Sequence, residues 1–254
     1  MKMGDIEYPS LQGSVSEAEW KTRLDLAAVF RLIPVLGWWD LSQAPAAARI
    51  PGTSHYLFNP KGVLFEEVTA SSLVKIDING DKVTDSPLTH LKANWFPFKA
   101  VFSTRTDVDW AIHSHDDWVA ALSARKERLQ PVTQSGAIAL ALGVDYHEYD
   151  GVEIVEDRNP ALQQSLGATA KRLILLNHGL VVLGSSANEI VITTSTLTKA
   201  CRGQVLAGRL DGLVPIRSQV VDTIVGDLFR PGGIDYIWPA LLRKLDRMDP
   251  SWKE

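Results

Sequence analysis

The chain has 254 residues, 45% apolar and 22% charged, as is typical of a globular protein with one substantial core. Its formal charge of -4 argues against nucleic acid as the main partner, and the single cysteine, Cys201, excludes an internal disulfide framework. No apolar run is long enough to cross a membrane, and the first residues lack the pattern of a signal peptide. We therefore expect a cytoplasmic protein without a nucleic-acid or membrane partner.

The first long element that the sequence predicts is a helix over residues 17–36. Ser16 and Glu19 form a capping-box pattern at its start, where two side chains satisfy free backbone N–H groups. Apolar residues then recur at helical spacing until Gly37, a residue that commonly ends helices.

Strands and helices mingle along the rest of the chain. Strands are expected within 46–60, at 73–77 before the turn signal Asn79-Gly80, at 108–113, around 146–149 and 152–155, and at 173–176 and 180–183. Helices are expected over 91–103 with Pro97 in the first turn, from Asp116 onward, near 161–167, over 187–210 and in the tail after 234. We expect a flexible segment over 1–15 and a single layered α/β domain over 16–254.

Two apolar runs end in histidines. His113-Ser114-His115 follows the run 108–112, and alternate side chains of a strand share a face, so these two imidazoles can bind one metal ion. His178 ends the second run, 172–177, and is followed at once by Gly179. Three neutral imidazoles with an open coordination position are typical of a catalytic divalent-metal site. The spacing alone leaves open that each histidine is an ordinary hydrogen-bonded side chain.

Together these features resemble the class II aldolase/adducin family from about residue 20 to the end. The resemblance rests on His113-Ser114-His115, Asn177-His178-Gly179-Leu180 and the segments 65–77, 200–205 and 242–251. It implies a three-layer α/β/α fold with a central, mainly antiparallel sheet, and a homotetramer with active sites at subunit interfaces. It also implies one divalent metal ion per subunit, held by His113, His115 and His178. Zinc is the first expectation, although imidazole also accepts manganese, iron, cobalt and nickel.

The chain departs from the aldolases of that family at a glutamate that transfers protons. Counting back from the His-x-His pattern places Asn94 at this position, and an amide does not exchange protons near neutral pH. The candidate replacements are Asp116, Asp117, Glu66, Glu67, Tyr236 and a metal-bound water. Asp116 also begins a predicted helix, where a carboxylate commonly caps the first turn instead.

Positions that hold the substrate phosphate in sugar-phosphate members of the family also differ. The family's turn here reads Lys61-Gly62, and its serine pair reads Lys92-Ala93. Two lysines can meet a substrate carboxylate as point charges, or can simply be solvated surface residues. Trp95 and Phe98 are expected to line an apolar pocket wall, which suits a flat or hydrophobic substrate better than a sugar; core packing is the alternative.

The resemblance, taken with these departures from it, therefore implies a metal-dependent carbon–carbon lyase of the decarboxylase or aldolase type. Its expected substrate is a small, non-phosphorylated hydroxy or keto acid that bears a carboxylate. Both aromatic and non-aromatic acids of this kind are candidates. A metal held by three histidines would stabilise the enolate left when CO2 or an aldehyde departs. Decarboxylation needs no base to begin, so it tolerates loss of the glutamate better than aldol cleavage. The alternatives are a non-haem iron oxygenase of an aromatic keto acid and a non-catalytic adducin-like module.

Overall fold

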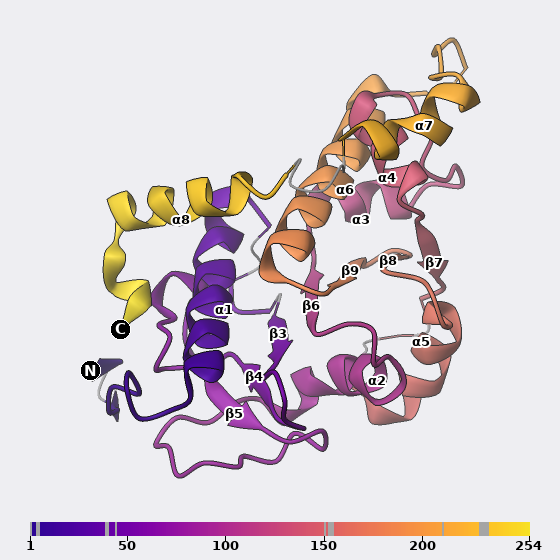
Figure 1. Cartoon of the computed structure of the whole chain (residues 1–254). Coiled ribbons are helices and arrows are strands. Elements are labelled where there is room, and N and C mark those ends of the chain that lie inside the picture. Colours follow the sequence, from indigo (N-terminus) through magenta and orange to yellow (C-terminus); the bar gives the residue numbers. More distant parts are fainter. Residues whose placement is uncertain are drawn as a thin grey trace.

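The computed structural model describes residues 2–3, 6–38, 41–43, 45–149, 151, 155–209, 211–228 and 234–254. A seven-stranded sheet runs through the described part of the chain, with helices on both of its faces (Figure 1). The strands are β3 (Ala46–Arg49), β4 (Tyr56–Phe58), β5 (Val74–Ile76), β6 (Trp110–Ser114), β7 (Asp145–His147), β8 (Arg172–Leu175) and β9 (Gly179–Gly184). Their spatial order is β5-β4-β3-β6-β9-β8-β7, and every neighbouring pair is antiparallel except β7 with β8.

The helices form two layers around this sheet. They are α1 (Glu17–Leu36), α2 (Phe96–Thr104), α3 (Asp117–Ser123), α4 (Gln134–Ala141), α5 (Asn159–Leu166), α6 (Ala187–Ala207), α7 (Ser218–Leu228) and α8 (Ile237–Met248). Figure 1 shows α2 and α5 on one side of the sheet, and α3, α4 and α6 on the other. This arrangement confirms the expected three-layer α/β/α fold with a mainly antiparallel centre. Among the described residues, every helix is too short or too polar to span a bilayer.

Each face of the sheet carries its own apolar core. Trp110 and Ile112 of β6 belong to the core beneath α1, α3 and α6, whereas Ala111 between them belongs to the core beneath α2 and α5. His113 pairs with Val181 of β9, which is a member of the second core. The alternation of β6 therefore directs His113 toward the α2 and α5 side, as the period of two residues predicts.

Helix α1 matches the expected bounds and caps. The Ser16 side chain accepts a hydrogen bond from the Glu19 N–H at 3.2 Å, so one of the free donors at the helix start is satisfied. At the other end Gly37 adopts φ of 78°, a left-handed conformation that residues with a side chain rarely take. The middle of the helix, from Leu26 to Ile33, is buried against the sheet.

Several other elements differ from expectation. Two helices, α4 and α7, were not predicted; Gln134–Ala141 consists largely of small residues without a clear amphipathic period, a reason that does not apply to α7. The segment 91–103 divides into a 3-10 turn over Lys92–Trp95 and helix α2, with Pro97 in the first turn of the helix. Of the strand expected over 152–155, only Val155 lies within the described residues, and it is irregular.

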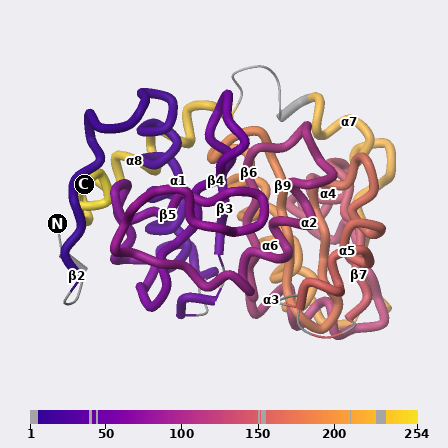
Figure 2. The backbone as a smooth tube through the Cα atoms, turned by 90° about the horizontal axis from the view of Figure 1, so that it is seen from below, coloured from indigo at the N-terminus to yellow at the C-terminus, as the bar shows by residue number. Residues whose placement is uncertain are grey.

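Residues 8–11 are more ordered than a flexible segment. Tyr8 is only 5% exposed, and its hydroxyl shares a 3.2 Å hydrogen bond with the hydroxyl of Thr69. The Leu11 N–H donates to the Ser71 hydroxyl at 3.0 Å. Figure 2 shows the N-terminal and C-terminal ends on the same side of the molecule. Residues 8–11 are thus fixed on the domain, which corrects our expectation for them, whereas the division at residue 15 stays a prediction.

Cys201 provides a simple test of the core beneath α6. Burial, first, and the nearby charge of Asp116 raise the pKa of its thiol to about 12. Because the thiolate is the reactive form, we expect no reaction of the native protein with a thiol reagent at about pH 8, and one reactive thiol per chain after unfolding. Rapid modification of the native chain, measured by mass spectrometry, would contradict the buried position.

Candidate metal centre

Three imidazoles converge where β6 ends and β9 begins. His115 Nε2 lies 2.9 Å from His113 Nε2 and 2.9 Å from His178 Nε2. The three rings each offer a nitrogen within 4.8 Å of the others, and none of the rings stacks face to face on another. Ring nitrogens gathered around one point in this way are suited to share a cation. The structure thus brings together all three histidines that the sequence predicted as metal ligands.

A hydrogen bond orients the His113 ring. Its Nδ1 lies 2.9 Å from the carbonyl oxygen of Leu180 on the neighbouring strand β9. A carbonyl only accepts hydrogen bonds, so Nδ1 carries the hydrogen and the neutral ring presents Nε2 as a bare lone pair. Metal-binding histidines commonly use the second nitrogen in this manner. The donor set therefore fits a divalent metal.

Burial keeps His113 in its neutral form. His113 is 8% exposed, and this burial, followed by the neighbouring imidazoles of His115 and His178, lowers the pKa of His113 well below its usual value. A neutral imidazole is the form that binds a metal.

The β8–β9 turn places the third histidine. Asn177 adopts φ of 57°, a left-handed conformation that asparagine tolerates better than most residues with a side chain. Gly179 follows His178, and a Cβ built on it would lie 2.1 Å from the carbonyl oxygen of Ser114. Only glycine permits β9 to approach this closely at Ser114, the last residue of β6, which lies between His113 and His115. The tight turn and the glycine together bring His178 beside His113 and His115.

Asp116, the first candidate acid, serves as a helix cap. Its Oδ1 accepts hydrogen bonds at 3.0 Å from the N–H groups of Trp118 and Val119, at the start of α3. Burial, as the largest influence, raises the pKa of this carboxyl. Asp116 also lines a cavity of about 240 Å³ together with Lys199 and Arg202 of α6. The capping role is confirmed, and a catalytic role for Asp116 stays a prediction.

The two candidate substrate lysines lie at the surface. Lys92 Nζ pairs with Asp81 Oδ1 at 2.6 Å, and both side chains are at least half exposed. Lys61 is also exposed, and its backbone N–H donates to the Thr89 carbonyl at 2.7 Å. In the single chain Lys92 is therefore a surface residue, which was the alternative to substrate binding. Substrate binding by either lysine stays a prediction. Asn94 is half-buried in the 3-10 turn, so its position neither assigns nor removes a role.

Trp95 and Phe98 belong to the core beneath α2. Trp95 is 0% exposed, and its indole N–H donates to the Ile78 carbonyl at 2.9 Å. Phe98 is 2% exposed and stacks on Trp95, with ring centroids 6.0 Å apart. Both rings also contact Phe58 of β4 edge to face. The expectation of an open pocket wall is therefore corrected, because these rings fill the space between α2 and the sheet.

Two tyrosines differ in their relation to the histidines. Tyr236, proposed from the sequence, is 70% exposed in the turn before α8, a helix that packs on α1. Tyr149 was not proposed, yet its ring centroid lies 6.1 Å from that of His178, and it is 50% exposed. Tyr149 follows β7, and β7 pairs in parallel with β8, so the two chain segments end side by side. No local motif marks this tyrosine, and only the strand pairing identifies it.

Sequence relatives of the chain include bacterial and animal proteins. Residues 24–205 match the family described as class II aldolase and adducin N-terminal domain. A Pseudomonas aeruginosa protein described as "Putative aldolase class 2 protein" is 40% identical over 252 residues, which cover 96% of each chain. Mouse alpha-adducin is 39% identical over 217 residues, covering 80% of this chain and 29% of the adducin.

Solved structures give the same assignment. An aldolase II superfamily protein from Pseudomonas syringae superimposes with a TM-score of 0.89 at 33% identity, covering 97% of this chain and 100% of the other. The L-fuculose 1-phosphate aldolase of Glaciozyma antarctica shares the fold with a TM-score of 0.79 at 20% identity, over 98% of this chain and 96% of that one. From its sequence, its sheet and its histidine cluster, the chain belongs to the class II aldolase/adducin family.

Proposed function

We propose that this protein is a metal-dependent carbon–carbon lyase that acts on a small, non-phosphorylated hydroxy or keto acid bearing a carboxylate. The observation that carries the proposal is the convergence of three imidazole Nε2 atoms where β6 ends and β9 begins. Family membership with proteins named as aldolases supports the reaction class. We expect zinc first, then manganese, iron, cobalt or nickel, since three imidazoles accept all of them.

The histidines have a defined task in this reaction. His113, His115 and His178 would hold the metal, which when bound supplies a Lewis acid that stabilises negative charge on a substrate oxygen. The hydrogen bond from His113 Nδ1 to the Leu180 carbonyl fixes one ring, so its lone pair needs little rearrangement on binding. Cleavage of the substrate C–C bond leaves its electron pair in an enolate, and a proton must then return to carbon.

Protonation of the substrate carbon after cleavage needs a proton donor near the histidines. Asn94 cannot supply a proton near neutral pH, and Asp116 accepts two backbone hydrogen bonds as a cap. The half-exposed phenol of Tyr149 lies beside the His178 ring and, among the described residues, forms no hydrogen bond that would give it such a structural role. We propose Tyr149 as the proton donor, with Tyr236 of a neighbouring subunit as the alternative if the protein is a tetramer.

The substrate class follows from what the chain lacks. Lys61 and Lys92 replace the hydroxyl donors with which sugar-phosphate members of the family bind a phosphate, and Lys92 is already paired with Asp81. Decarboxylation is the reaction that we favour, because it starts without removal of a proton. The fuculose-phosphate aldolase shares only the fold at 20% identity, so its substrate does not transfer to this chain.

A substrate screen tests the proposal directly. Keto acids and aromatic hydroxy acids are incubated with protein purified without a chelating tag and supplied with each of the five metals. Release of CO2 or of an aldehyde, dependent on metal, is the expected result. Turnover that occurs only in the presence of oxygen would replace the lyase with an iron oxygenase. Aldehyde release from a sugar phosphate would contradict the substrate class.

A non-catalytic module is the second candidate, because mouse alpha-adducin is 39% identical over most of this chain. Metal analysis separates the two. We expect close to one metal ion per chain after purification without a tag. Protein that holds no metal, and that takes up none on addition of zinc or manganese, would favour the module and remove the lyase.

Asn94 is expected to have no part in holding the metal. The Asn94→Ala variant should retain the metal content of the unaltered protein, since the three imidazoles already form the donor set. Elemental analysis of both proteins measures this directly. Loss of metal from a folded Asn94→Ala variant would make Asn94 a ligand and would overturn its assignment.

Tyr149 is expected to affect turnover without affecting metal content. Tyr149→Phe removes only the hydroxyl, so kcat should fall about 100-fold, the usual contribution of a positioned acid, while KM and metal content stay the same. Tyr146→Phe is the matched control, because the Tyr146 hydroxyl instead accepts from the Leu129 N–H at 3.0 Å. An unchanged kcat in Tyr149→Phe would show that Tyr149 is not the proton donor.

A further inference from the structure

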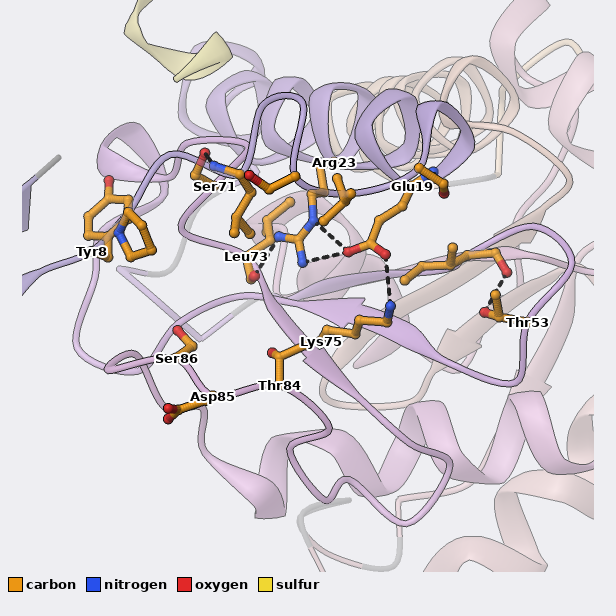
Figure 3. A pocket seen from close by; sticks show the side chains of 16 residues that line it. Tyr8, Glu19, Arg23, Thr53, Ser71, Leu73, Lys75, Thr84, Asp85 and Ser86 are labelled. Atoms are coloured by element: carbon orange, nitrogen blue, oxygen red, sulfur yellow. Dashed lines mark hydrogen bonds and ion pairs between the residues drawn. The ribbon is translucent and has the colours of Figure 1, made fainter.

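A second cavity lies between the start of α1 and the edge strand β5 (Figure 3). Its volume is about 470 Å³, enough for a small metabolite. The N-terminal residues 8–16 form one wall, α1 and β5 form the floor, and the loop that carries Thr84 and Ser86 forms the rim. None of the lining residues belongs to β6, β8 or β9.

Three charged side chains meet on the floor of this cavity. Glu19 of α1 accepts hydrogen bonds from Arg23 Nε at 3.0 Å and from Lys75 Nζ at 2.8 Å. The side chains of Glu19 and Arg23 are 6% and 1% exposed, and that of Lys75 is 18% exposed. Figure 3 shows Arg23 and Lys75 reaching the two different oxygens of the same carboxylate. Such burial fixes the three groups in position.

Arg23 is committed to the structure of the domain. Besides Glu19, its guanidinium donates to the carbonyl oxygens of Ala70 and Leu73, at 3.2 and 2.8 Å. Glu19 and Arg23 therefore form a complete buried pair, in which both charges are compensated. Their role in the fold does not require a further cation.

Lys75 adds a charge that this pair does not balance. Two cations and one anion leave the floor with a net charge of +1, and the other acid of the lining, Asp85, lies exposed at the rim. An ammonium has three N–H donors, and one of them is used on Glu19. Charge held away from water is costly unless it is paired. The remaining donors of Lys75 are therefore available to an anion in the cavity.

The rest of the lining suits a hydroxylated molecule. Five residues with hydroxyl groups, Ser14, Thr53, Ser71, Thr84 and Ser86, border the cavity. Leu11, Ile50 and Leu73 supply apolar contacts between them. One available cation matches a single negative charge, and the flexible point charge of lysine suits a carboxylate without the fork geometry that arginine would add. Hydroxyl side chains around it can form hydrogen bonds with hydroxyl groups of such a ligand.

This cavity is separate from the metal centre. Lys75 pairs with Leu57 in the sheet and shares its face, the face of the core beneath α1, whereas His113 shares the opposite face with Ala111. Strand β5 also lies three places from β6 in the sheet, about 14 Å at the usual spacing of strands. A ligand in one site does not reach the other.

We propose that this cavity is a second binding site, for a small hydroxycarboxylate whose carboxylate pairs with Lys75 and whose hydroxyls meet the serine and threonine side chains of the wall. The site is independent of the lyase reaction and would bind its ligand in metal-free protein. Binding of this kind offers the enzyme a means of sensing an acid metabolite without chelating it.

Calorimetric titration of the full chain, stripped of metal by a chelator, tests the site with gluconate as the probe. Gluconate should bind, whereas sorbitol, which has the hydroxyls without the carboxylate, should not. Lys75→Met keeps the side-chain stem and should weaken gluconate binding by about tenfold or more, as expected when a hydrogen bond to a charged group is lost. Lys21→Met removes an exposed lysine ion pair on helix α1 and should leave the affinity unchanged.

A second variant keeps the test decisive if Lys75→Met does not fold. Thr84→Trp fills the rim without touching the buried charges, and it should also weaken gluconate binding by about tenfold or more. Equal affinity in these variants and the unaltered chain would overturn the proposal, as would absence of gluconate binding, or binding of sorbitol as tight as gluconate. Gluconate binding that requires added metal would place the probe at the histidines and would equally overturn the second site, while leaving the lyase proposal intact.

Discussion

Replacing His178 with alanine is expected to remove the bound metal and the lyase activity together. His178→Ala takes one of three nitrogens from the cluster, and the remaining pair, His113 and His115, offers two ligands where a stable site needs at least three. We expect metal affinity to fall by more than about 100-fold, beyond the usual effect of altering a residue behind a ligand. Elemental analysis and a competition titration with a metal-binding dye measure this loss.

The control for this experiment is another imidazole of the chain. His55 lies in the turn between β3 and β4, outside the cluster, so His55→Ala should keep both metal and activity. His113→Ala provides an independent repeat on a different strand. Retention of metal by both His113→Ala and His178→Ala, in folded protein, would show that these residues are not the ligands.

Gly179→Ala is expected to damage both the fold and the metal centre. The added Cβ would meet the Ser114 carbonyl oxygen at 2.1 Å, and a backbone atom in a paired strand cannot turn aside as a flexible side chain does. Strand β9 must move away from β6, which separates His178 from His113 and His115. We expect the free energy of unfolding to fall by about 3 kcal/mol, the upper range for overpacking, and metal binding to weaken with it.

Denaturant unfolding of the metal-free protein isolates the effect on the fold. Gly226→Ala is the matched control, because no atom lies within 4 Å of its added Cβ on helix α7. There alanine should be neutral or should stabilise by up to about 1 kcal/mol, as in other helix interiors. Equal stability of Gly179→Ala and the unaltered chain would show that β6 and β9 are not packed as closely as described.

Local signals were sufficient for many elements of the fold. The caps Ser16 and Gly37 bounded α1, and the run before His113 predicted β6, because both depend on residues close in sequence. Helix α4 was missed because its small residues show no amphipathic period. The mainly antiparallel sheet was expected from the family resemblance alone, and the order of its strands was not predicted, since periodicity within a strand does not specify its neighbours.

The parts of the candidate site that depend on residues close in sequence were predictable, and the parts that depend on strand pairing were not. His113 in β6 and His115 just after it are two residues apart, so their spacing predicted the pair, whereas the convergence of His178 depended on the pairing of β6 with β9. Trp95 was misplaced because an aromatic segment looks the same in a core as in a pocket wall, and only its burial decides. Tyr149 was missed because its neighbourhood depends on β7 lying beside β8.

The alternation of β6 has a consequence for how this chain tolerates change in length. Ala111 and His113 point to one side of the sheet, and Ile112 and Ser114 to the other. One residue inserted or deleted between Trp110 and His113 would reverse the faces of the strand residues that follow, and the His113 imidazole would enter the apolar layer below α1 and α6. The loops on either side of β6 can change in length during evolution. Within β6, only insertions or deletions of an even number of residues keep His113 on its face of the sheet.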